Sequence, residues 1–472
     1  MTAVISDLDK ETLAPVERLE ALCDPGTLDL IRTEVMSRQM GEKARAGDGV
    51  IGGAGLIEGR PVFCYAQDAG YVGGSLGAAH AETIVRVLEL ADRARAPVVG
   101  FVGSGGARMQ EGVNALGGYA RIFRRTVALS GVVPQISIIS GLSAGGGAYS
   151  PALTDWIVMT EGSSMFLTGP GVVREAMGED VTASQLGGYK VHERNGVAHF
   201  LSPSDRDAAL LARELLGYLP SHRDLPAPVL PPREPGAADP AQHVPADPRK
   251  VYDVRSVISA LADSGELLEV APGWARNLVT AFVRIDGRSV GVIANQPRHL
   301  GGVLDADSSE KGARFVNRCD SFRIPLLVLV DTPGFLPGTR QEAAGVIRHG
   351  ATLVQAFAGA TVPRVTVILR KAFGGAYITM NSKDLGADYV FAWDSAEIGV
   401  MGAKPAVGII HRRELAAADD PELKRDELAG LYADLHLRPS VAAAHGQIDE
   451  LIEPSGTRSR VVWALRTLER AR

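Results

Sequence analysis

Residues 132–150 read VVPQISIISGLSAGGGAYS and combine a β-branched run with a cluster of glycines. The run is typical of a buried strand, and the glycines at 145–147 follow where that strand ends. Consecutive glycines at a strand end let backbone N–H groups approach a ligand, and a helix that begins there adds positive potential. The segment therefore predicts a strand, a turn and a helix. The turn is either an oxyanion-binding site or a tight strand–helix crossing.

A similar segment lies in the second half of the chain, where residues 361–379 read TVPRVTVILRKAFGGAYIT. Ala376 follows Ala148 by 228 residues, and Pro325 follows Pro97 by the same interval. Several anchors in the same order at nearly one offset indicate a duplication. In each half, apolar strands alternate with helix-period segments, which predicts mainly parallel pairing. We expect two α/β domains in tandem, each with one anion-stabilising turn.

A proline-rich segment separates the two halves. Nine prolines fall within the 29 residues from 220 to 248, a composition typical of an extended linker. The sequence predicts an N-terminal domain over 1–220, a linker over 221–250 and a C-terminal domain over 251–472.

The composition argues against several classes of function. The 472 residues carry 49 Lys and Arg against 55 Asp and Glu, a formal charge of −6, so a nucleic-acid or anionic-membrane partner is not favoured. Three separated cysteines without a C-x-x-C pair, and the lack of an H-E-x-x-H motif, argue against a bound metal. No secretory leader is recognised, and proline and glycine break the uncharged run 126–154. We expect a cytoplasmic protein without a membrane span.

Phosphate-binding and dinucleotide-binding motifs are incomplete. The Walker loop needs a Lys-Ser or Lys-Thr pair that neither glycine-rich turn supplies. In GSGGARMQEG, residues 103–112, Arg108 stands where the third glycine of a G-x-G-x-x-G fingerprint belongs. ATP hydrolysis and dinucleotide binding are therefore not supported.

Side chains suited to acid–base or nucleophilic chemistry are few. The serines near the first turn lack a G-x-S-x-G elbow, lone histidines are more often structural, and carboxylates at loop–helix boundaries commonly cap helices. A protein with two backbone anion sites and no evident base stabilises developing negative charge while another molecule accepts the proton. The side chains considered are Ser143, Ser150, His192, His199, Asp331 and Glu342.

Long strings in both halves resemble one family. From about residue 19 to residue 458, the chain is similar to the biotin-dependent carboxyltransferase β subunits of acyl-CoA carboxylases. The strings that carry the resemblance are SGGARMQEGVNALGGYARIF (104–123), VPQISIISGLSAGGGAYSPALTD (133–155), TGPGVVREAMGEDVTASQLGG (168–188), ANQPRHLGGVLDADSSEKGARFVNRCD (294–320), DTPGFLPGTRQEAAGVIRHGA (331–351), VPRVTVILRKAFGGAY (362–377) and AEIGVMGAKPAVGII (396–410).

The resemblance implies two crotonase-like (ClpP/crotonase) domains and a reaction. The carboxyl group of carboxybiotin, held on a separate carrier protein, would move to the α-carbon of a short acyl-CoA. By resemblance, Gly145 and Gly146 would form the hole for the thioester enolate, and Gly375 and Ala376 the hole for the ureido oxygen of biotin. The ureido nitrogen would take the α-proton, so the protein itself needs no base.

The resemblance also implies partners. These are the acyl-CoA substrate, a biotin carboxylase with its biotin carboxyl carrier subunit, and further copies of the chain in a hexamer of two trimers. CoA would lie mainly on the first half, and biotin on the second half of a neighbouring subunit. The residues expected to bind these substrates are Ser104, Gly105, Gly106, Ala107, Arg108, Tyr149, Tyr377 and Ile378.

One position bears on the choice of substrate. The family tends to have Asp at the position of Ile378 in propionyl-specific members and an apolar residue in members that accept acetyl groups, so we expect both acetyl-CoA and propionyl-CoA to be used. Simple core packing is the alternative role for this isoleucine. Three departures from the family pattern are Thr83 in place of Lys, which removes a possible phosphate contact, Gly147 in place of Ala, and Asp394 in place of Pro.

Other functions remain open at this point. A crotonase-type hydratase or isomerase would act on CoA thioesters without biotin, but it would need a carboxylate at the hole and only one half of the tandem. A malonyl-type decarboxylase subunit would run the same chemistry backward. A non-catalytic scaffold would not need the two glycine turns.

Overall fold

A computed structural model describes residues 12–237 and 239–469 of the chain. The chain divides into two compact units, the first ending at Ala227 and the second beginning at Pro228. This division lies inside the proline-rich segment.

The remainder of the proline-rich segment packs on the second unit. Leu230 N–H donates to the Gly287 carbonyl at 2.9 Å, and Gly236 N–H donates to the Ser259 carbonyl at 3.2 Å. A short 3-10 helix, Pro240–His243, follows. Much of the segment expected as a linker is therefore held by backbone hydrogen bonds to the second unit.

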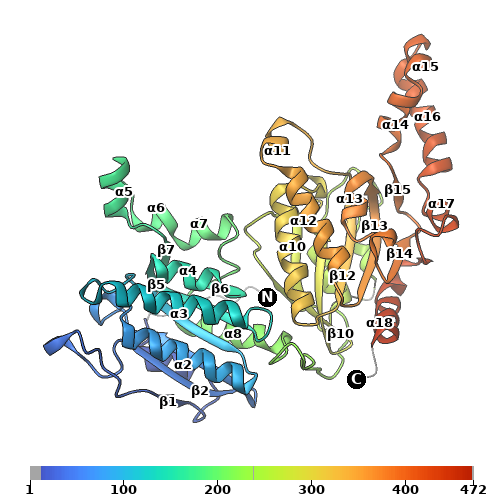
Figure 1. Cartoon of the computed structure of the whole chain (residues 1–472). Helices are drawn as coiled ribbons and strands as arrows, with labels where there is room; N and C mark the ends of the chain where they lie inside the picture. Colours follow the sequence, from blue (N-terminus) through green and yellow to red (C-terminus); the bar gives the residue numbers. More distant parts are fainter. Residues whose placement is uncertain (1–11, 238, 470–472) are drawn as a thin grey trace. The chain divides into compact units, whose positions relative to one another are not determined.

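The first unit is a sheet with helices packed on it (Figure 1). The strands follow the order β1-β2-β3-β4-β5-β6-β8, with β7 paired to β5. The β1–β2 and β2–β3 pairs are antiparallel, and the remaining pairs are parallel. The strands are β1 Asp29–Ile31, β2 Val50–Ile57, β3 Arg60–Gln67, β4 Val98–Ser104, β5 Gln135–Ala144, β6 Trp156–Thr160, β7 Ser164–Phe166 and β8 Phe200–Ser202. The helices are α1 Pro15–Leu22, α2 Ala78–Ala94, α3 Val113–Leu129, α4 Gly146–Ala152, α5 Pro170–Met177, α6 Ala183–Gly187, α7 Tyr189–Arg194 and α8 Asp205–Tyr218.

The second unit repeats this topology. Its strand order is β16-β14-β13-β12-β11-β10-β9, with β15 paired to β13, and again the first two pairs in the sequence are antiparallel and the rest parallel. The strands are β9 Leu267–Glu269, β10 Leu278–Ile285, β11 Arg288–Asn295, β12 Leu326–Thr332, β13 Arg364–Phe373, β14 Tyr389–Trp393, β15 Glu397–Gly399 and β16 Glu450–Ile452. The helices are α9 Val254–Leu261, α10 Ala306–Ser321, α11 Thr339–Ala343, α12 Val346–Gly359, α13 Gly374–Thr379, α14 Ala403–Ile410, α15 Arg412–Ala417, α16 Pro421–His436, α17 Pro439–Ala444 and α18 Thr457–Leu468. The predicted duplication of mainly parallel α/β units is confirmed.

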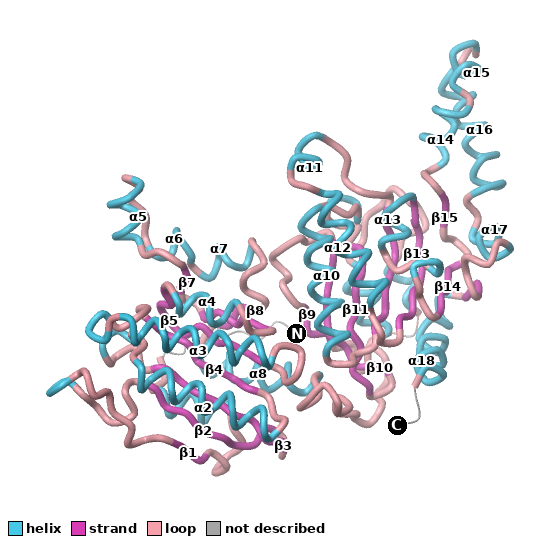
Figure 2. The backbone as a smooth tube through the Cα atoms, in the orientation of Figure 1, coloured by secondary structure: helices cyan, strands magenta, loops and turns pink. Residues whose placement is uncertain are grey.

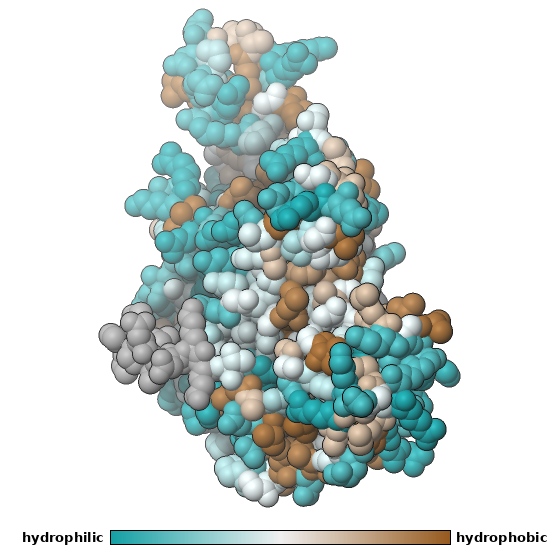
Figure 3. Space-filling model, turned by 90° about the vertical axis from the view of Figure 1, so that its left-hand side faces the viewer, coloured by the Kyte–Doolittle hydropathy of each residue, from teal (hydrophilic) through white to brown (hydrophobic). Residues whose placement is uncertain are grey.

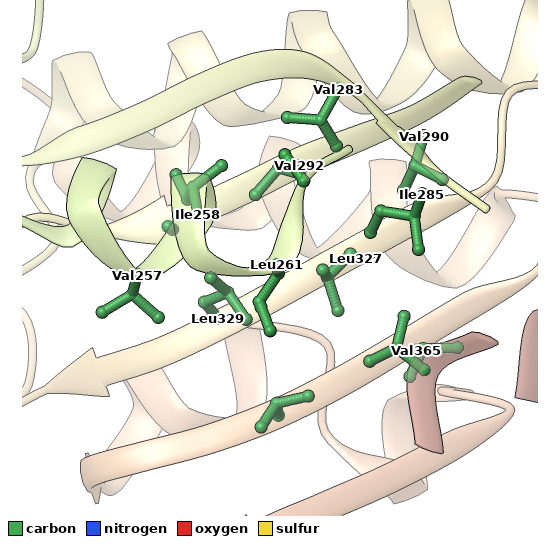
Figure 4. Packing of buried hydrophobic residues seen from close by; sticks show 14 of the residues in the cluster. Val257, Ile258, Leu261, Val283, Ile285, Val290, Val292, Leu327, Leu329 and Val365 are labelled. Carbon is green, nitrogen blue, oxygen red and sulfur yellow. The ribbon is translucent and has the colours of Figure 1, made fainter. Parts of the chain in front are cut away.

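Strand alternation explains how the second sheet is covered on both faces. In β10, Val283 and its alternate neighbours join a core with α9 and α18, whereas Phe282 points the other way and its ring lies 5.1 Å from that of Phe315 on α10. Figure 2 shows α10 and α12 side by side along the sheet. Figure 4 shows Val257 and Leu261 of α9 facing the strand residues Val292, Leu327 and Val365. Burial on both faces suits the apolar parallel strands.

The central strand of each unit changes partners near its end. The first part of β5 pairs with β6 and its last three residues pair with β7; β13 does the same with β14 and β15. Each strand has ten residues and is followed at once by a glycine with positive φ, 58° at Gly145 and 60° at Gly374. The offset between the turns is therefore 229 rather than 228.

This offset corrects the pairing of the two turns. Gly146 and Gly147 correspond to Gly375 and Ala376, because each pair follows the positive-φ glycine that comes directly after the ten-residue strand. Tyr149 corresponds to Ile378 and not to Tyr377. The Ala-Tyr pairs at 148–149 and 376–377 are 228 residues apart, so an alignment on them is shifted by one residue from the alignment of the two strand ends.

Helical arms extend from the sheets (Figure 1). In the first unit the arm holds α5 to α7, and in the second it holds α14 to α16. The second arm has a small core of its own, made by Val407, Leu415, Leu428 and Ala429. Figure 3 shows apolar side chains among polar ones at its top. The large exposed apolar residues of this arm are Ile409, Ile410, Leu423, Leu431 and Leu435.

Candidate functional site

The first glycine turn joins β5 to α4. Gly145 has φ 58°, and its N–H donates to the Phe166 carbonyl at 3.0 Å. This bond belongs to the pairing of β5 with β7, so the Gly145 N–H is not available to an oxyanion. The assignment of Gly145 as a donor is corrected. Its role is the left-handed backbone conformation that starts the helix.

The available donors of the turn are Gly146 and Gly147. They are the first two residues of α4, where backbone N–H groups have no acceptor inside the helix. No acceptor for either N–H is found among residues 12–237 and 239–469. Both N–H groups therefore remain for a ligand at the end of the strand, which is the usual ligand position in parallel sheets.

A tyrosine ring lies against this turn. A Cβ on Gly146 would meet three ring carbons of Tyr119 at 2.7 Å, so only glycine fits there without movement. Tyr119 lies on α3, and its hydroxyl makes a 3.0 Å hydrogen bond with the Ser104 hydroxyl at the end of β4. The sequence analysis missed Tyr119, although its place on the buried face of the helix before β5 was visible as helical periodicity.

The loop after β4 was expected to bind substrate. Gly105 N–H donates to the Gly73 carbonyl at 2.9 Å, and Gly106 N–H donates to Ser104 Oγ at 3.3 Å. The Ser104 side chain is fully buried, so it does not reach a substrate directly. Ala107 is different, because no acceptor for its N–H exists in the described part of the chain. It is the loop residue best placed to offer a third backbone donor.

Arg108 is buried in an ion network. Its Nη1 lies 2.6 Å from Asp48 Oδ1 and 2.8 Å from Glu111 Oε1, and its side chain has no exposed area. Nη2 donates to the Ser75 carbonyl at 3.0 Å. Burial raises the pKa of Asp48. The expectation that Arg108 binds substrate is corrected: its guanidinium holds the loop that leads into α3.

The second turn has the same construction with different support. Gly374 carries the positive φ, and Gly375 and Ala376 follow in the first turn of α13. No acceptor for the N–H of Gly375 or Ala376 is found in the described residues. Gly375 is exposed and Ala376 is fully buried. A ring again lies nearby, but it is Phe335 from the loop after β12, 3.9 Å from a Cβ on Gly375.

Phe335 occupies the position in the second unit that Ala107 occupies in the first, because each forms a parallel bridge with the loop before the preceding helix. Leu304 N–H donates to the Gly334 carbonyl and Leu336 N–H to the Leu304 carbonyl, so the Phe335 N–H points away from that pairing. No acceptor for it occurs in residues 12–237 and 239–469. Sequence analysis missed Phe335 because the loops after β4 and β12 have few residues in common.

The residues after the turns differ in exposure. Tyr149 and Ile378, which occupy equivalent positions, are each 52% exposed. Ile378 is therefore not a core residue, and packing does not explain it within this chain. The Tyr377 hydroxyl is buried without a hydrogen-bond partner in the described residues, and burial, with Asp384, raises the pKa of Tyr377 to about 12.

The histidines and serines considered as catalytic groups are engaged in structure. His192 Nε2 lies 2.6 Å from the Met165 carbonyl, and His199 Nδ1 accepts the Ile157 N–H at 3.0 Å. The Ser143 hydroxyl donates to the Gly147 carbonyl at 2.8 Å, which ties the strand to the turn. Ser150 is buried.

The two carboxylates considered as catalytic groups, Asp331 and Glu342, lie in different surroundings. Asp331 is buried and accepts from Tyr252 Oη and Arg370 Nε, both at 3.0 Å, and burial raises its pKa. Glu342 is exposed on α11. Asp331 therefore anchors the end of β12 and faces no substrate.

Three residues, Thr83, Gly147 and Asp394, differ from the family pattern, and each has a defined environment in the structure. Thr83 is buried, its hydroxyl bonds to the Ala79 carbonyl at 3.3 Å, and Arg32 Nε donates to it at 3.2 Å. Thr83 is engaged within the first unit, and the loss of a phosphate contact at this position stays a prediction. Asp394 lies exposed in the turn after β14, and a Cβ on Gly147 would meet Ser104 Cβ at 3.0 Å.

The described residues hold neither a metal-binding cluster nor a membrane-spanning helix. They contain no group of three or more His, Cys, Asp or Glu residues arranged to hold a metal ion. Among them there is also no helix with the length and apolar character needed to cross a bilayer.

Comparison with known proteins shows the family of the chain. The carboxyl transferase domain matches residues 7–472. The chain belongs to the carboxyl transferase family. The methylmalonyl-CoA carboxyltransferase 12S subunit of Propionibacterium freudenreichii subsp. shermanii is 48% identical to this carboxyl transferase over 458 residues, which are 95% of this chain and 87% of that protein. The β5 subunit of a biotin-dependent acetyl-/propionyl-coenzyme A carboxylase of Mycobacterium tuberculosis is 47% identical over 481 residues, 98% of this chain and 88% of that protein.

A solved structure agrees with the fold of this carboxyl transferase. The crystal structure of a transcarboxylase 12S hexamer, with methylmalonyl-coenzyme A and methylmalonic acid bound, has a TM-score of 0.93 and 47% identity, and covers 98% of this chain and 91% of that one. The predictions of the family, of the crotonase-like α/β fold and of an acyl-CoA carboxyltransferase are confirmed.

Proposed function

We propose that the chain transfers a carboxyl group from carboxybiotin to the α-carbon of acetyl-CoA or propionyl-CoA, giving malonyl-CoA or methylmalonyl-CoA. One observation carries the proposal: each unit ends its central strand in a turn whose two backbone N–H groups have no acceptor in the described residues. The biotin is carried on a separate protein, which works with a biotin carboxylase. The working assembly is a hexamer, as in the 12S structure. A cytoplasmic location remains a prediction from the sequence.

The backbone N–H groups of the two turns stabilise the two oxygens that gain negative charge during the reaction. Gly146 and Gly147 hold the thioester oxygen as the enolate forms, and Gly375 and Ala376 hold the ureido oxygen of biotin. Carboxybiotin supplies the carbon dioxide and the nitrogen that accepts the α-proton. Backbone donors suit this task because they are fixed before the reaction, and one such donor is typically worth about 2.7–4 kcal/mol.

Residues beside the turns choose the substrate. Ile378 is half exposed next to the second turn, and its apolar side chain leaves acetyl and propionyl groups both acceptable. Ala107 and Phe335 offer one further N–H each. A hydratase or isomerase is not favoured, because the carboxylates beside the two loops, Glu111 and Asp331, are held in buried ion pairs.

Carboxyl exchange without ATP tests the proposal. The purified full-length chain, mixed with free biotin and malonyl-CoA or methylmalonyl-CoA, is expected to move the carboxyl group onto biotin. Loss of malonyl-CoA and formation of acetyl-CoA are followed together by chromatography. A folded, assembled protein that shows no biotin-dependent turnover at saturating biotin contradicts the proposal, and biotin-independent loss of carboxyl favours a decarboxylase.

A further inference from the structure

The turn of the first unit rests on an aromatic ring. Three carbons of the Tyr119 ring lie at the same 2.7 Å from the place of a Cβ on Gly146, so the face of the ring covers that residue. Tyr119 is only 5% exposed. Since Gly146 opens α4, the position of this ring limits where the first N–H groups of that helix can lie.

The ring is itself held in place by a hydroxyl pair. Tyr119 Oη and Ser104 Oγ are 3.0 Å apart, and Ser104 Oγ also accepts the Gly106 N–H at 3.3 Å. Ser104 has no exposed area, and its Cβ lies 3.0 Å from the place of a Cβ on Gly147. Tyr119 therefore lies against Gly146, and Ser104 lies against Gly147, so each donor residue has a buried side chain beside it.

A second aromatic contact joins α3 to α4. The rings of Tyr119 and Phe123 are 5.8 Å apart, and Phe123 meets Tyr149 edge-on at 6.3 Å. Tyr119 and Phe123 are one helical turn apart on α3, as are Gly146 and Tyr149 on α4, so the two helices meet along matching faces. Tyr119 and Phe123 of α3 therefore both pack against the segment that carries the donors.

We propose that Tyr119, held by Ser104, is a positioning residue that aims the N–H groups of Gly146 and Gly147. This inference rests on the proposed function, because it gives those donors their task. Neither side chain touches substrate, since both are buried beneath the turn. Among the described residues of the second unit, no equivalent hydroxyl pair lies against the turn: Phe335, which lies near Gly375, carries no hydroxyl and makes a looser 3.9 Å contact.

Steady-state kinetics of carboxyl exchange test the positioning role. Tyr119→Phe keeps the ring and removes the hydroxyl, and Ser104→Ala removes its partner. Each is expected to lower kcat about 3–10-fold, the value of one hydrogen bond, with KM for the CoA thioester changed less than about 2-fold. The double variant is expected to match Ser104→Ala, because that change already breaks the hydroxyl pair together with the bond from the Gly106 N–H. Tyr65→Phe, at a buried tyrosine that packs on Gly100, is the matched control and should keep the wild-type kcat.

Three results overturn the inference in an active protein. These are unchanged kcat in both single variants, a double variant whose loss is the product of the single losses, and a rise in KM at constant kcat. A wild-type protein without carboxyl exchange overturns the proposed function together with this inference, so the two failures are distinguishable.

A melting experiment tests the ring contact without turnover. Gly146→Ala is expected to lower the melting temperature by about 2–8 °C in the wild-type background, because the new methyl group overlaps the ring. In a Tyr119→Leu background the same change should cost less than half as much. Equal losses in the two backgrounds contradict the contact on which the inference depends.

Discussion

Replacing Gly146 by alanine is the sharpest test of the first donor turn. The new Cβ would lie 2.7 Å from three ring carbons of Tyr119, whereas carbon atoms pack at about 3.5–4.0 Å. The turn or the ring must therefore move by roughly 0.8 Å or more. The backbone conformation is not the obstacle, because Gly146 is not among the residues with positive φ.

The expected loss follows from that displacement. A misplacement of about 1 Å can cost about 10²-fold in rate, so kcat for carboxyl exchange should fall by about two orders of magnitude. Overpacking costs typically about 1–3 kcal/mol of stability. Purified variants are compared by exchange kinetics, by differential scanning calorimetry and by size-exclusion chromatography, which reports assembly.

Two further alanine variants separate the possible causes. Gly430→Ala, on α16 and with no atom within 4 Å of the new Cβ, should keep wild-type activity and gain up to about 1 kcal/mol. Gly375→Ala meets only Phe335 at 3.9 Å and should keep the wild-type melting temperature. If Gly146→Ala retains kcat within about 3-fold of the wild type, the donor turn is not rigidly placed and the reasoning from displacement is wrong.

Three other changes give separate readouts. Ile378→Asp should lower kcat/KM for acetyl-CoA relative to propionyl-CoA, measured with both thioesters; an unchanged ratio would remove this side chain from substrate choice. Burial, aided by the Arg108 charge, lowers the pKa of His80 to about 3, so the unfolded chain binds a proton that the folded chain does not. Stability should therefore fall as pH falls from about 6.5 towards 3, by up to about 5 kcal/mol. Urea unfolding at several pH values should show a shallower fall for His80→Gln, and identical slopes would contradict this. Arg108→Met leaves Asp48 and Glu111 unpaired, which should cost about 3–5 kcal/mol of stability; a melting temperature equal to that of the wild type would show that the ion network is dispensable.

The fold could be predicted largely because the halves repeat. Apolar strands that end in glycine clusters, with helices between them, define a parallel α/β unit, and two such sets in the same order define a tandem. The proline-rich segment was harder to interpret. Proline content signals extended backbone, but it does not show that Leu230 and Gly236 find hydrogen-bond partners on the second unit.

The sequence predicts both glycine turns, and where the structure differs on single residues the differences have physical causes. The glycine cluster predicts where the turn lies. Only the pairing of β5 with β7 shows that the Gly145 N–H donates to the Phe166 carbonyl. Arg108 looked like a substrate-binding cation, because a sequence does not reveal that Asp48 lies beside it. Tyr119 could not be assigned, since its role depends on a contact with a turn 27 positions later in the chain.

The supports of the two turns come from different elements. In the first unit the ring is carried by a helix, and in the second it is carried by a loop, although both turns begin with a glycine of positive φ. Substitutions at matching positions are therefore not equivalent. A saturation scan across both turns is therefore expected to show different tolerated residues at equivalent positions of the two turns.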